Sequence, residues 1–474
     1  MEKILQRSIT EHAAALACGE YTSVALTQAF LDRIDVRNSE INAYLYVDRA
    51  GALSAAEKSD ARRASGECRG ALDGIPYALK DNIAANGLPM TCGSKILEGY
   101  VSPYDSTMVM RLKNAGGVLL GKTNLDEFAM GSSGEYSAYG VTKNPYDQTR
   151  VAGGSSSGSA AAVADGMAVF ALGSDTGGSV RQPAAFCGVY GLKPTYGVLS
   201  RYGLASMASS LDCVGILSRT AEDCGLLLDV LSGQDVHDAT SVLYAPSEVR
   251  LHERALRVGV VSFADTEGMD EEIRAVLTRA AARLSACGAL VEAVTLPIPD
   301  EAIAAYTVLS STEAASNLAR YDGVRYGRRS ANADTLSELY ENSRSEGLGA
   351  EVKRRILFGT DMLIRGNREV YYLRAERMRE EVRRCMTLLT EKYDLLLSPT
   401  TPTVAFPIGS VRSPDALYCA DMCTVYANLA GLPALSMPME RNADGLPIAV
   451  QLTARRLGEN VLLSAVKLFE KGGA

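Results

Sequence analysis

The sequence contains no tryptophan and only three histidines, His12, His237 and His252. So few histidines argue against a Ser-His-Asp enzyme and against a histidine-rich metal site, because both depend on imidazole groups. The ten cysteines include no Cys-x-x-Cys pair, so we expect neither a disulfide framework nor a metal site. Cys419 and Cys423 lie one helical turn apart, but two thiols alone make a poor metal site.

Long apolar runs and a surplus of positive charge are also missing. The most apolar stretch, at residues 160–172, contains Asp165 and Gly166 and falls short of the ~20 apolar residues of a membrane span. The first seven residues have no apolar segment typical of a secretory signal, so we expect a cytoplasmic protein without a membrane partner. With a net charge of −8, the chain is not expected to hold nucleic acid by itself.

What the sequence does contain is typical of a layered α/β protein. Of its 474 residues, 47% are hydrophobic and 22% charged, which is enough apolar material for a substantial core. Ser8 to Glu11 form a capping box that opens a helix, which Gly19 can close, so a helix is predicted at 8–19; further helices are predicted at 22–36 and 270–287. Short β-type runs alternate with helical stretches and predict a largely buried central sheet. These runs lie at 117–120, 168–172, 258–261, 395–397 and 448–452.

Two segments leave the domain organisation open. Residues 222–256 are polar and fit either a subdomain junction or an exposed loop inside one domain. Residues 305–384 are charged and helical in pattern, which fits an insertion or a cap over a site.

Two short motifs match known patterns without the context that those patterns need. Residues 116–123 satisfy G-x-x-x-x-G-K-T, but Val118 to Leu120 look like a strand instead of the phosphate-binding loop. Residues 154–158 satisfy G-x-S-x-G, with Ser156 in the place of an esterase nucleophile. That interpretation needs a downstream histidine, and both His237 and His252 lie in polar sequence typical of an exposed surface.

Three larger blocks, at residues 74–82, 153–159 and 173–184, combine glycines and serines with Lys80. Each block alone also fits ordinary structure, such as a solvated lysine, a flexible linker or a tight turn. However, the serine run leads directly into the small apolar residues 160–164, and residues 176–179 directly follow an apolar strand. Linkers are seldom embedded in this way.

The chemistry of the three blocks fits a serine enzyme whose base is lysine. Serine needs a base before it can attack, and lysine fills that role in Ser-Lys enzymes. A free lysine with a pKa of ~10.4 is protonated at neutral pH, so Lys80 must be desolvated to act. A second serine can connect the lysine to the nucleophile. The small residues 176–179 allow backbone N–H groups to converge into an oxyanion hole.

Together the three blocks resemble the amidase signature family, whose Ser-Ser-Lys triad hydrolyses carboxamides through an acyl-enzyme. The resemblance spans nearly the whole chain. It implies an α/β amidase-signature fold in which a central mixed β-sheet is covered by helices on both faces. It also implies a single domain over residues 1–474, with N-terminal helices in 1–60, the signature core and triad in 61–225, and a helical cap-like segment in 300–390.

The resemblance also implies roles for individual residues. Ser179 matches the nucleophile, Ser155 matches the bridging serine that follows a cis peptide bond, and Lys80 matches the base. The residues that match the oxyanion hole are Thr176, Gly177 and Gly178.

Further stretches resemble one subfamily, the glutaminase subunits of tRNA-dependent amidotransferases. They lie at 200–204, 208–212, 316–327, 351–356 and 428–433. The resemblance implies a heterotrimer with a B and a C subunit, in which this chain hydrolyses glutamine and passes ammonia to a partner. That partner is expected to use ATP and Mg²⁺ to amidate Glu-tRNA(Gln) and to make most of the tRNA contacts, which agrees with the acidic charge. This chain itself is expected to need no cofactor.

Glutamine selection requires a cation for the α-carboxylate and an anion for the α-ammonium group. By the resemblance, Arg355 and Asp421 form this pair, Tyr306 is a lesser contact, and Arg354 is the rival of Arg355. The run 351–355 equally fits a helix of ordinary surface charges. A stand-alone amidase acting on another carboxamide is the alternative function, followed by a catalytically silent scaffold subunit.

Overall fold

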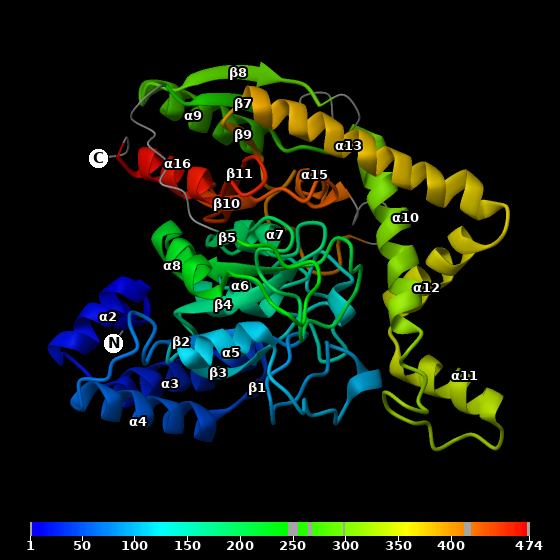
Figure 1. The fold of residues 1–474 in the computed structure, drawn as a ribbon, viewed down its shortest axis with the longest axis horizontal. Helices are drawn as coiled ribbons and strands as arrows, with labels where there is room; N and C mark the ends of the chain where they lie inside the picture. The colour runs from blue at the N-terminus through cyan, green and yellow to red at the C-terminus, as the bar shows by residue number, and fades with distance from the viewer. Residues whose placement is uncertain (1, 245–254, 264–267, 297–298, 412–418, 472–474) are drawn as a thin grey trace.

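The computed structural model describes residues 2–244, 255–263, 268–296, 299–411 and 419–471 (Figure 1). Within these residues, eleven strands form one sheet. The strands are β1 (Tyr44–Val47), β2 (Pro76–Lys80), β3 (Val118–Thr123), β4 (Phe170–Asp175), β5 (Tyr190–Lys193), β6 (Cys213–Ser218), β7 (Arg257–Val261), β8 (Leu290–Val294), β9 (Leu395–Pro399), β10 (Ala434–Arg441) and β11 (Pro447–Thr453). Their order in the sheet is β1-β3-β2-β4-β6-β5-β10-β11-β9-β7-β8.

The helices are named in chain order with the labels of Figure 1. In the first half they are α1 (Glu2–Leu5), α2 (Ile9–Cys18), α3 (Ser23–Ile41), α4 (Arg49–Ala64), η1 (Lys95–Leu97), α5 (Thr107–Asn114), η2 (Glu127–Ala129), α6 (Ser157–Ala164), α7 (Arg181–Phe186) and α8 (Ala221–Leu231). The later helices are α9 (Glu271–Ala286), α10 (Pro299–Leu318), α11 (Leu336–Gly347), α12 (Ala350–Leu363), η3 (Arg368–Tyr372), α13 (Leu373–Lys392), α15 (Val425–Leu429) and α16 (Glu459–Lys471).

The sheet is mixed, as predicted. Strand β2 pairs in parallel with β3 and β4, and β7 pairs in parallel with β8 and β9. The strands between these groups pair antiparallel, from β4 through β6, β5, β10 and β11 to β9. Because β2 and β4 are parallel neighbours, their carboxyl ends, at Lys80 and Asp175, meet at the same edge of the sheet, where ligands bind in open α/β sheets.

Helices pack on both faces of the sheet. Helix α8 packs on β5 and β6 with α5 and α16 as neighbours, whereas α7 packs on β5 and β10 with α6 beside it. Strand β5 contacts both α8 and α7, and β4, which contacts α6, is buried along its whole length. The prediction of an α/β fold with a central mixed sheet covered by helices is therefore confirmed.

Several local predictions are also confirmed. Ser8 and Glu11 form the predicted capping box, and Gly19 ends the helix in the left-handed conformation. Thr22 caps α3, which extends beyond the predicted end to Ile41. The predicted strands overlap β3, β4, β7, β9 and β11, with boundaries that differ by up to three residues. Because β3 covers Val118–Thr123, the phosphate-loop pattern is a strand, and Lys122 is buried in an ion pair with Asp81.

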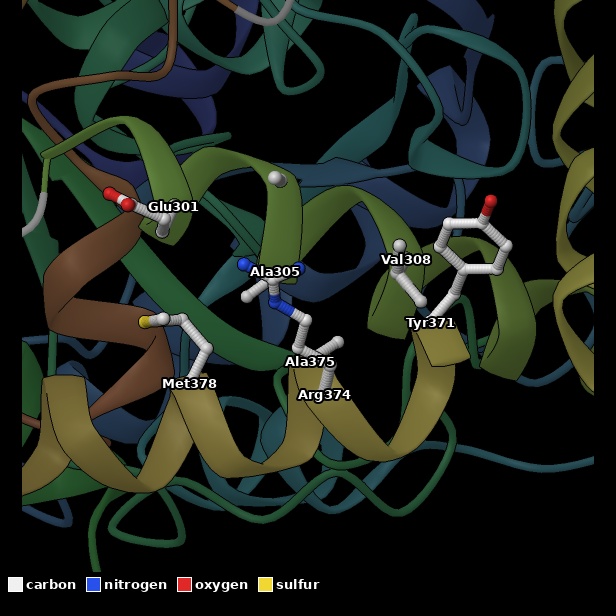
Figure 2. Close-up of a pocket in the computed structure, with 8 residues that line it drawn as sticks. Glu301, Ala305, Val308, Tyr371, Arg374, Ala375 and Met378 are labelled. Atoms are coloured by element: carbon white, nitrogen blue, oxygen red, sulfur yellow. The ribbon is translucent and has the colours of Figure 1, made fainter. Parts of the chain in front are cut away.

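Helices α10, α11 and α12 lie at one side of the sheet, and α13 runs from them back to β9 (Figure 1). Helices α10 and α12 approach closely, because a Cβ atom at Gly359 would lie only 2.0 Å from the carbonyl oxygen of Ser311. A mostly apolar hollow of about 200 Å³ lies between α10 and α13 (Figure 2). Its lining residues include Ala305, Val308, Tyr371 and Met378. None of the helices in the described part of the chain is long and apolar enough to span a membrane.

Candidate active site

Lys80 and the serine run meet at the carboxyl ends of β2 and β4. Lys80 is the last residue of β2 and is fully buried. Its Nζ atom lies 2.7 Å from the Oγ atom of Ser155, 2.9 Å from that of Ser156 and 2.9 Å from that of Ser174. The Gly154–Ser155 peptide bond is cis, as the family resemblance implies. The lysine therefore lies in a cage of hydroxyl groups.

Burial controls the charge of this lysine. Desolvation lowers the pKa of Lys80 to about 7, although the charges of Asp126, Asp175 and Asp212 oppose the shift. A large fraction of the amine is thus neutral near pH 7. A neutral amine has one lone pair and two N–H groups, so it can accept the Ser155 proton while it donates to Ser156 and Ser174.

Ser179 lies directly beyond the serine run. Its carbonyl oxygen accepts the backbone N–H of Ser156 at 3.0 Å, which joins the two blocks. The residue is 7% exposed, and its hydroxyl makes no hydrogen bond to the residues that the structure describes. Lys80 and Ser155 are thus in direct contact, whereas Ser179 lies next to them with an unengaged hydroxyl.

The rival nucleophile, Ser156, is held by the surrounding structure. Its hydroxyl is fully buried and donates to the carbonyl oxygen of Ser174 at 3.1 Å. It also accepts the backbone N–H of Ser174 at 3.3 Å. A serine with its hydroxyl engaged in this way connects two chain segments and is poorly placed to attack a substrate.

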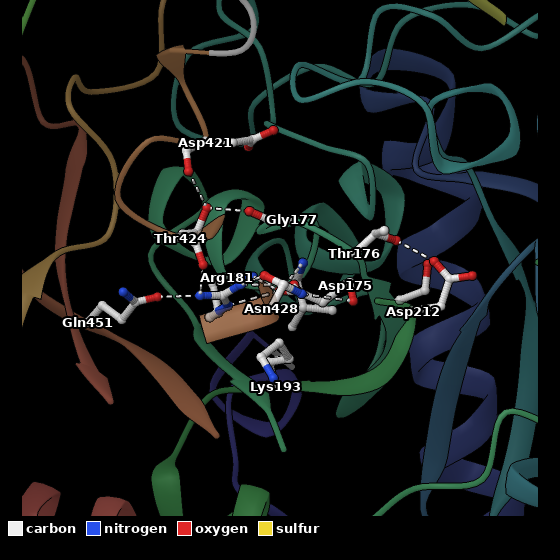
Figure 3. A network of polar contacts seen from close by, with 12 residues as sticks. Asp175, Thr176, Gly177, Arg181, Lys193, Asp212, Asp421, Thr424, Asn428 and Gln451 are labelled. Atoms are coloured by element: carbon white, nitrogen blue, oxygen red, sulfur yellow. Dashed lines mark hydrogen bonds and ion pairs between the residues drawn. The ribbon is translucent and has the colours of Figure 1, made fainter. Parts of the chain in front are cut away.

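The loop at residues 176–179 is fixed at both ends by a buried ion pair (Figure 3). Asp175, at the end of β4, binds the guanidinium group of Arg181 with both carboxylate oxygens, at 2.9 and 3.0 Å. Burial alone raises the pKa of Asp175, but the charge and hydrogen bonds of Arg181 lower it to about 2. The Nδ2 group of Asn428 donates to the same carboxylate at 2.9 Å. Both charges are therefore paired and hydrogen-bonded.

Further contacts hold the loop from the side. Thr176 donates its hydroxyl proton to Asp212 at 2.7 Å, and Thr424 donates to the carbonyl oxygen of Gly177 at 2.5 Å (Figure 3). The backbone N–H groups of Gly177, Gly178 and Ser179 have no acceptor among the described residues. These donors can therefore converge on a bound oxyanion, as in other acyl-transfer enzymes.

Asp421 lies at the edge of this loop. A Cβ atom at Gly178 would lie 3.4 Å from Oδ1 of Asp421, and Ser132 donates its hydroxyl proton to Oδ2 at 2.6 Å. Burial raises the pKa of Asp421 to about 7, although Ser132 and the charge of Arg355 oppose the shift. A cationic ligand group is the partner that would keep this carboxylate ionised.

Helix α12 distinguishes the two candidate arginines. The side chain of Arg355 is 4% exposed, whereas that of Arg354 is 34% exposed. Both guanidinium groups contact Glu351, at 2.7 Å from Arg355 and 2.8 Å from Arg354. Arg355 is one of the charges that lower the pKa of Asp421, so burial and charge together favour Arg355 over Arg354 as the cation of the site.

Tyr306, on α10, contacts the loop at residues 176–179. A Cβ atom at Gly177 would lie 2.5 Å from Cζ and 2.6 Å from the hydroxyl oxygen of Tyr306, so only glycine fits there. The neighbouring Ala305 lines the hollow behind α10 (Figure 2). The hollow and the loop thus lie on different sides of this helix, and the hollow is separate from the site.

Two residues of the site were not predicted from the sequence. The buried amide of Gln182 accepts the backbone N–H of Gly154 at 2.8 Å and donates to the carbonyl oxygen of Ser132 at 2.5 Å. Together with the Ser132–Asp421 contact, this joins the serine run to the acidic end of the site. Ser132 lies in the Gly131–Ser132–Ser133–Gly134 stretch, a glycine-serine cluster that is the one sequence signal pointing to it.

His12 and His237 lie outside this arrangement. Burial lowers the pKa of His12 to about 3, and its ring lies 2.8 Å from the hydroxyl of Tyr21 near α2. His237 is exposed, as expected, and stacks on Tyr202, whereas His252 lies outside the described residues. Cys423 is buried and Cys419 is exposed.

Comparison with known proteins gives the family. The chain matches the family model described as Amidase over residues 25–463. The chain belongs to the amidase family. The two blocks around Lys80 and Ser179 therefore lie in an amidase-type enzyme, and the family resemblance drawn from the sequence is confirmed.

Amidase-family relatives with a more specific name match nearly the whole chain. It is 49% identical over 457 residues to the A subunit of the glutamyl-tRNA(Gln) amidotransferase of Moorella thermoacetica, covering 95% of this chain and 93% of that protein. It is 47% identical over 459 residues to the protein of the same name from Symbiobacterium thermophilum, covering 96% and 94%.

Solved amidase-family structures agree with the fold. The crystal structure of the A subunit of the glutamyl-tRNA(Gln) amidotransferase from Thermotoga maritima is 37% identical, with a TM-score of 0.81, and the match covers 99% of this chain and 95% of that one. The native peptide amidase from Stenotrophomonas maltophilia is 31% identical, with a TM-score of 0.82 and coverage of 98% and 96%. The amidase-signature fold thus serves both a peptide amidase and a component of an amidotransferase.

Proposed function

We propose that this chain is the glutaminase subunit of a glutamyl-tRNA(Gln) amidotransferase. The observation that carries the proposal is the buried Lys80, with its pKa lowered to about 7 and its amine 2.7 Å from Ser155, next to a loop bordered by Asp421. Lys80 is a base for serine chemistry, and Asp421 is an anion suited to the α-ammonium group of an amino acid. The names of the relatives support the same function.

In the proposed reaction, Ser179 forms an ester with the γ-carbonyl carbon of glutamine. Neutral Lys80 takes the proton of Ser155, and Ser155 takes the proton of Ser179 as the Ser179 oxygen attacks. The backbone N–H groups of the loop from Thr176 to Ser179 stabilise the negative charge that develops on the carbonyl oxygen, and the Thr176 side chain also holds the start of the loop. As the C–N bond breaks, the proton returns from Lys80 through Ser155 to the nitrogen, which leaves as ammonia. Water then cleaves the ester by the same relay and releases glutamate.

Selection of glutamine follows from the charges around the loop. We propose that Asp421 pairs with the α-ammonium group, Arg355 with the α-carboxylate, and that Tyr306 contacts the bound substrate. A simple amide lacks both charges and leaves these buried groups without a ligand, which costs affinity. The pairing also keeps Asp421 ionised at neutral pH, where burial alone favours its neutral form.

The partners belong to the same proposal. We infer a heterotrimer with a B and a C subunit in which ammonia passes to the partner that uses ATP and Mg²⁺ to amidate Glu-tRNA(Gln). That partner makes most of the tRNA contacts, since this chain carries a net charge of −8. The cytoplasm, where tRNA is charged, is the proposed compartment.

The deciding experiment is amidation of Glu-tRNA(Gln) by this chain coexpressed with candidate B and C subunits. The wild-type complex is expected to use glutamine or ammonium salts, whereas the complex with Ser179→Ala uses ammonium salts alone. A chain that neither copurifies with the subunits nor supports amidation, but hydrolyses other carboxamides, would make the stand-alone amidase the better account.

A further inference from the structure

A buried carboxylate outside the triad connects the catalytic core to α12. Glu127, in η2, is 2% exposed. Its Oε2 atom accepts the backbone N–H of Gly349 at 2.9 Å, and its Oε1 atom accepts the hydroxyl proton of Ser94. A Cβ atom at Gly349 would lie 2.2 Å from Oε2, so a side chain there would displace the carboxylate. The contact is thus close.

These contacts fix the turn that leads into α12. Gly349 is the N-cap residue of α12, the helix that carries Glu351 and Arg355. The hydroxyl oxygen of Ser94 also lies 3.1 Å from the carbonyl oxygen of Gly347, the last residue of α11, so its one proton is shared between Glu127 and Gly347. Glu127 and Ser94 therefore hold both sides of the turn between the two helices.

The residue before Glu127 faces the triad. Asp126 donates its backbone N–H to the carbonyl oxygen of Ser155 at 3.3 Å. Its carboxylate accepts the backbone N–H groups of Gly134 and Tyr136, both at 3.0 Å. Asp126 therefore contacts the backbone around the bridging serine, whereas the next residue, Glu127, contacts the start of α12.

We propose that Glu127 is a positioning residue that sets where Arg355 lies relative to the serine run and thereby sets the affinity for the substrate α-carboxylate. The inference rests on the proposed function, in which Arg355 binds that carboxylate. Arg355 lies six residues, less than two helical turns, beyond the N-cap at Gly349, so a shift of the helix start moves its guanidinium group. Glu127 itself touches no reacting atom.

The test is a double-mutant cycle on glutamine hydrolysis by the purified complex with its partner subunits. Arg355→Ala is expected to raise the KM for glutamine by tenfold or more, on the order of one lost charge-assisted hydrogen bond. Glu127→Ala is expected to raise KM about tenfold, which is the effect of losing about one hydrogen bond, while kcat stays within about twofold. In the variant with both changes, KM should equal that of Arg355→Ala, because Glu127 acts through Arg355.

Two further variants separate positioning from a general loss of structure. In Glu127→Gln the amide oxygen can accept the N–H of Gly349 while the NH2 group donates to the hydroxyl oxygen of Ser94, whose proton then binds the carbonyl oxygen of Gly347, so KM should stay at the wild-type value. Glu98→Ala removes an exposed carboxylate near the same loops, where it pairs with Lys95 and Arg328, and should leave KM unchanged. If Glu127→Ala does not fold, Ser94→Ala takes its place in the cycle.

The outcomes distinguish the two proposals. Suppose that Arg355→Ala raises KM. If Glu127→Ala (or Ser94→Ala) then leaves KM unchanged, lowers kcat instead, or adds to the effect of Arg355→Ala on KM, the positioning role is wrong. The substrate site itself still stands in that case. If Arg355→Ala leaves KM unchanged, the proposed glutamine site itself is wrong.

Discussion

At the residue scale, the chemistry of Lys80 follows from its surroundings. Burial lowers its pKa to about 7, and the neutral form is the one that can accept a proton from Ser155. We expect kcat for glutamine hydrolysis to rise as the pH increases from 6 to 8, with a midpoint near 7. Lys80→Ala should lower kcat by ~10³ or more, since members of such a relay act as a unit. A flat profile, measured as ammonia release in buffers of constant ionic strength, would exclude lysine as the base.

The two adjacent serines that contact Lys80 give a second prediction at this scale. Ser155 lies 2.7 Å from the amine and is the proposed proton carrier, whereas Ser156 connects the amine to Ser174. Ser155→Ala should be nearly as damaging as Lys80→Ala, and Ser156→Ala should lower kcat only about tenfold, the scale of one hydrogen bond. Steady-state kinetics of the two variants provide the measurement. A larger loss in Ser156→Ala than in Ser155→Ala would reverse their roles.

The need for a desolvated lysine could be predicted from the sequence, because serine chemistry without a suitable histidine leaves few other bases. The residues around the lysine could not. Gln182 and Ser132 act through an amide and a carbonyl oxygen, and their side-chain types alone do not indicate that role. Arg355 and Asp421 lie 66 positions apart in the sequence, so their proximity depends on the packing of α12 and was implied only by the family resemblance.

At the scale of elements, the loop at residues 176–179 depends on the ion pair at its base. Arg181→Met leaves the buried carboxylate of Asp175 without its cation, which is expected to cost ~3–5 kcal/mol of unfolding free energy and most of the activity. Urea-induced unfolding gives the measurement. Arg383→Met is the matched control, because Arg383 pairs with Glu380 at the exposed surface and should cost less than ~1 kcal/mol. Equal costs for both variants would contradict the anchoring role of Arg181.

Elements with strong local signals were predicted well. The capping box at Ser8, the left-handed Gly19 and the apolar run of β4 all act over a few residues, and the structure contains each of them. η2 was missed because Phe128 adopts a positive φ of 50°, which no local signal indicates for a phenylalanine. The centroids of the Phe128 and Tyr321 rings lie 5.0 Å apart. Tyr321 is nearly two hundred residues further along the chain, so this packing, which stabilises the conformation, could not be predicted from the local sequence.

At the scale of the whole molecule, one continuous sheet connects the strands before and after α10 to α13. This supports the proposal that residues 1–474 form a single domain, with residues 300–390 as a cap-like segment. The N-terminal helices join it through buried polar contacts. Asp223, in α8, accepts the backbone N–H of Ile9 at the start of α2, at 3.0 Å.

The burial of Asp223 makes the global stability depend on pH. Burial raises the pKa of Asp223 from 3.8 to about 6, although the Ile9 N–H and Thr220 oppose the shift. A raised pKa in the folded state contributes stability that is complete below about pH 4 and is lost as the pH rises through 6. Asp223→Asn should therefore shrink the difference in unfolding free energy between pH 4.5 and pH 8 by about 2 kcal/mol, because part of the total effect is already lost at pH 4.5. An unchanged difference in denaturant titrations would show that Asp223 does not titrate in this way.

The central claim is that Ser179 carries the acyl group, and it can be tested on the intact protein. Glutamine turnover is stopped with acid within the first catalytic cycles, and the digested chain is searched by mass spectrometry for a glutamyl ester. The account predicts the added mass on the peptide that contains Ser179, and neither an adduct nor ammonia release in Ser179→Ala. A glutamyl group on Ser156, or ammonia release by Ser179→Ala at the wild-type rate, would contradict it.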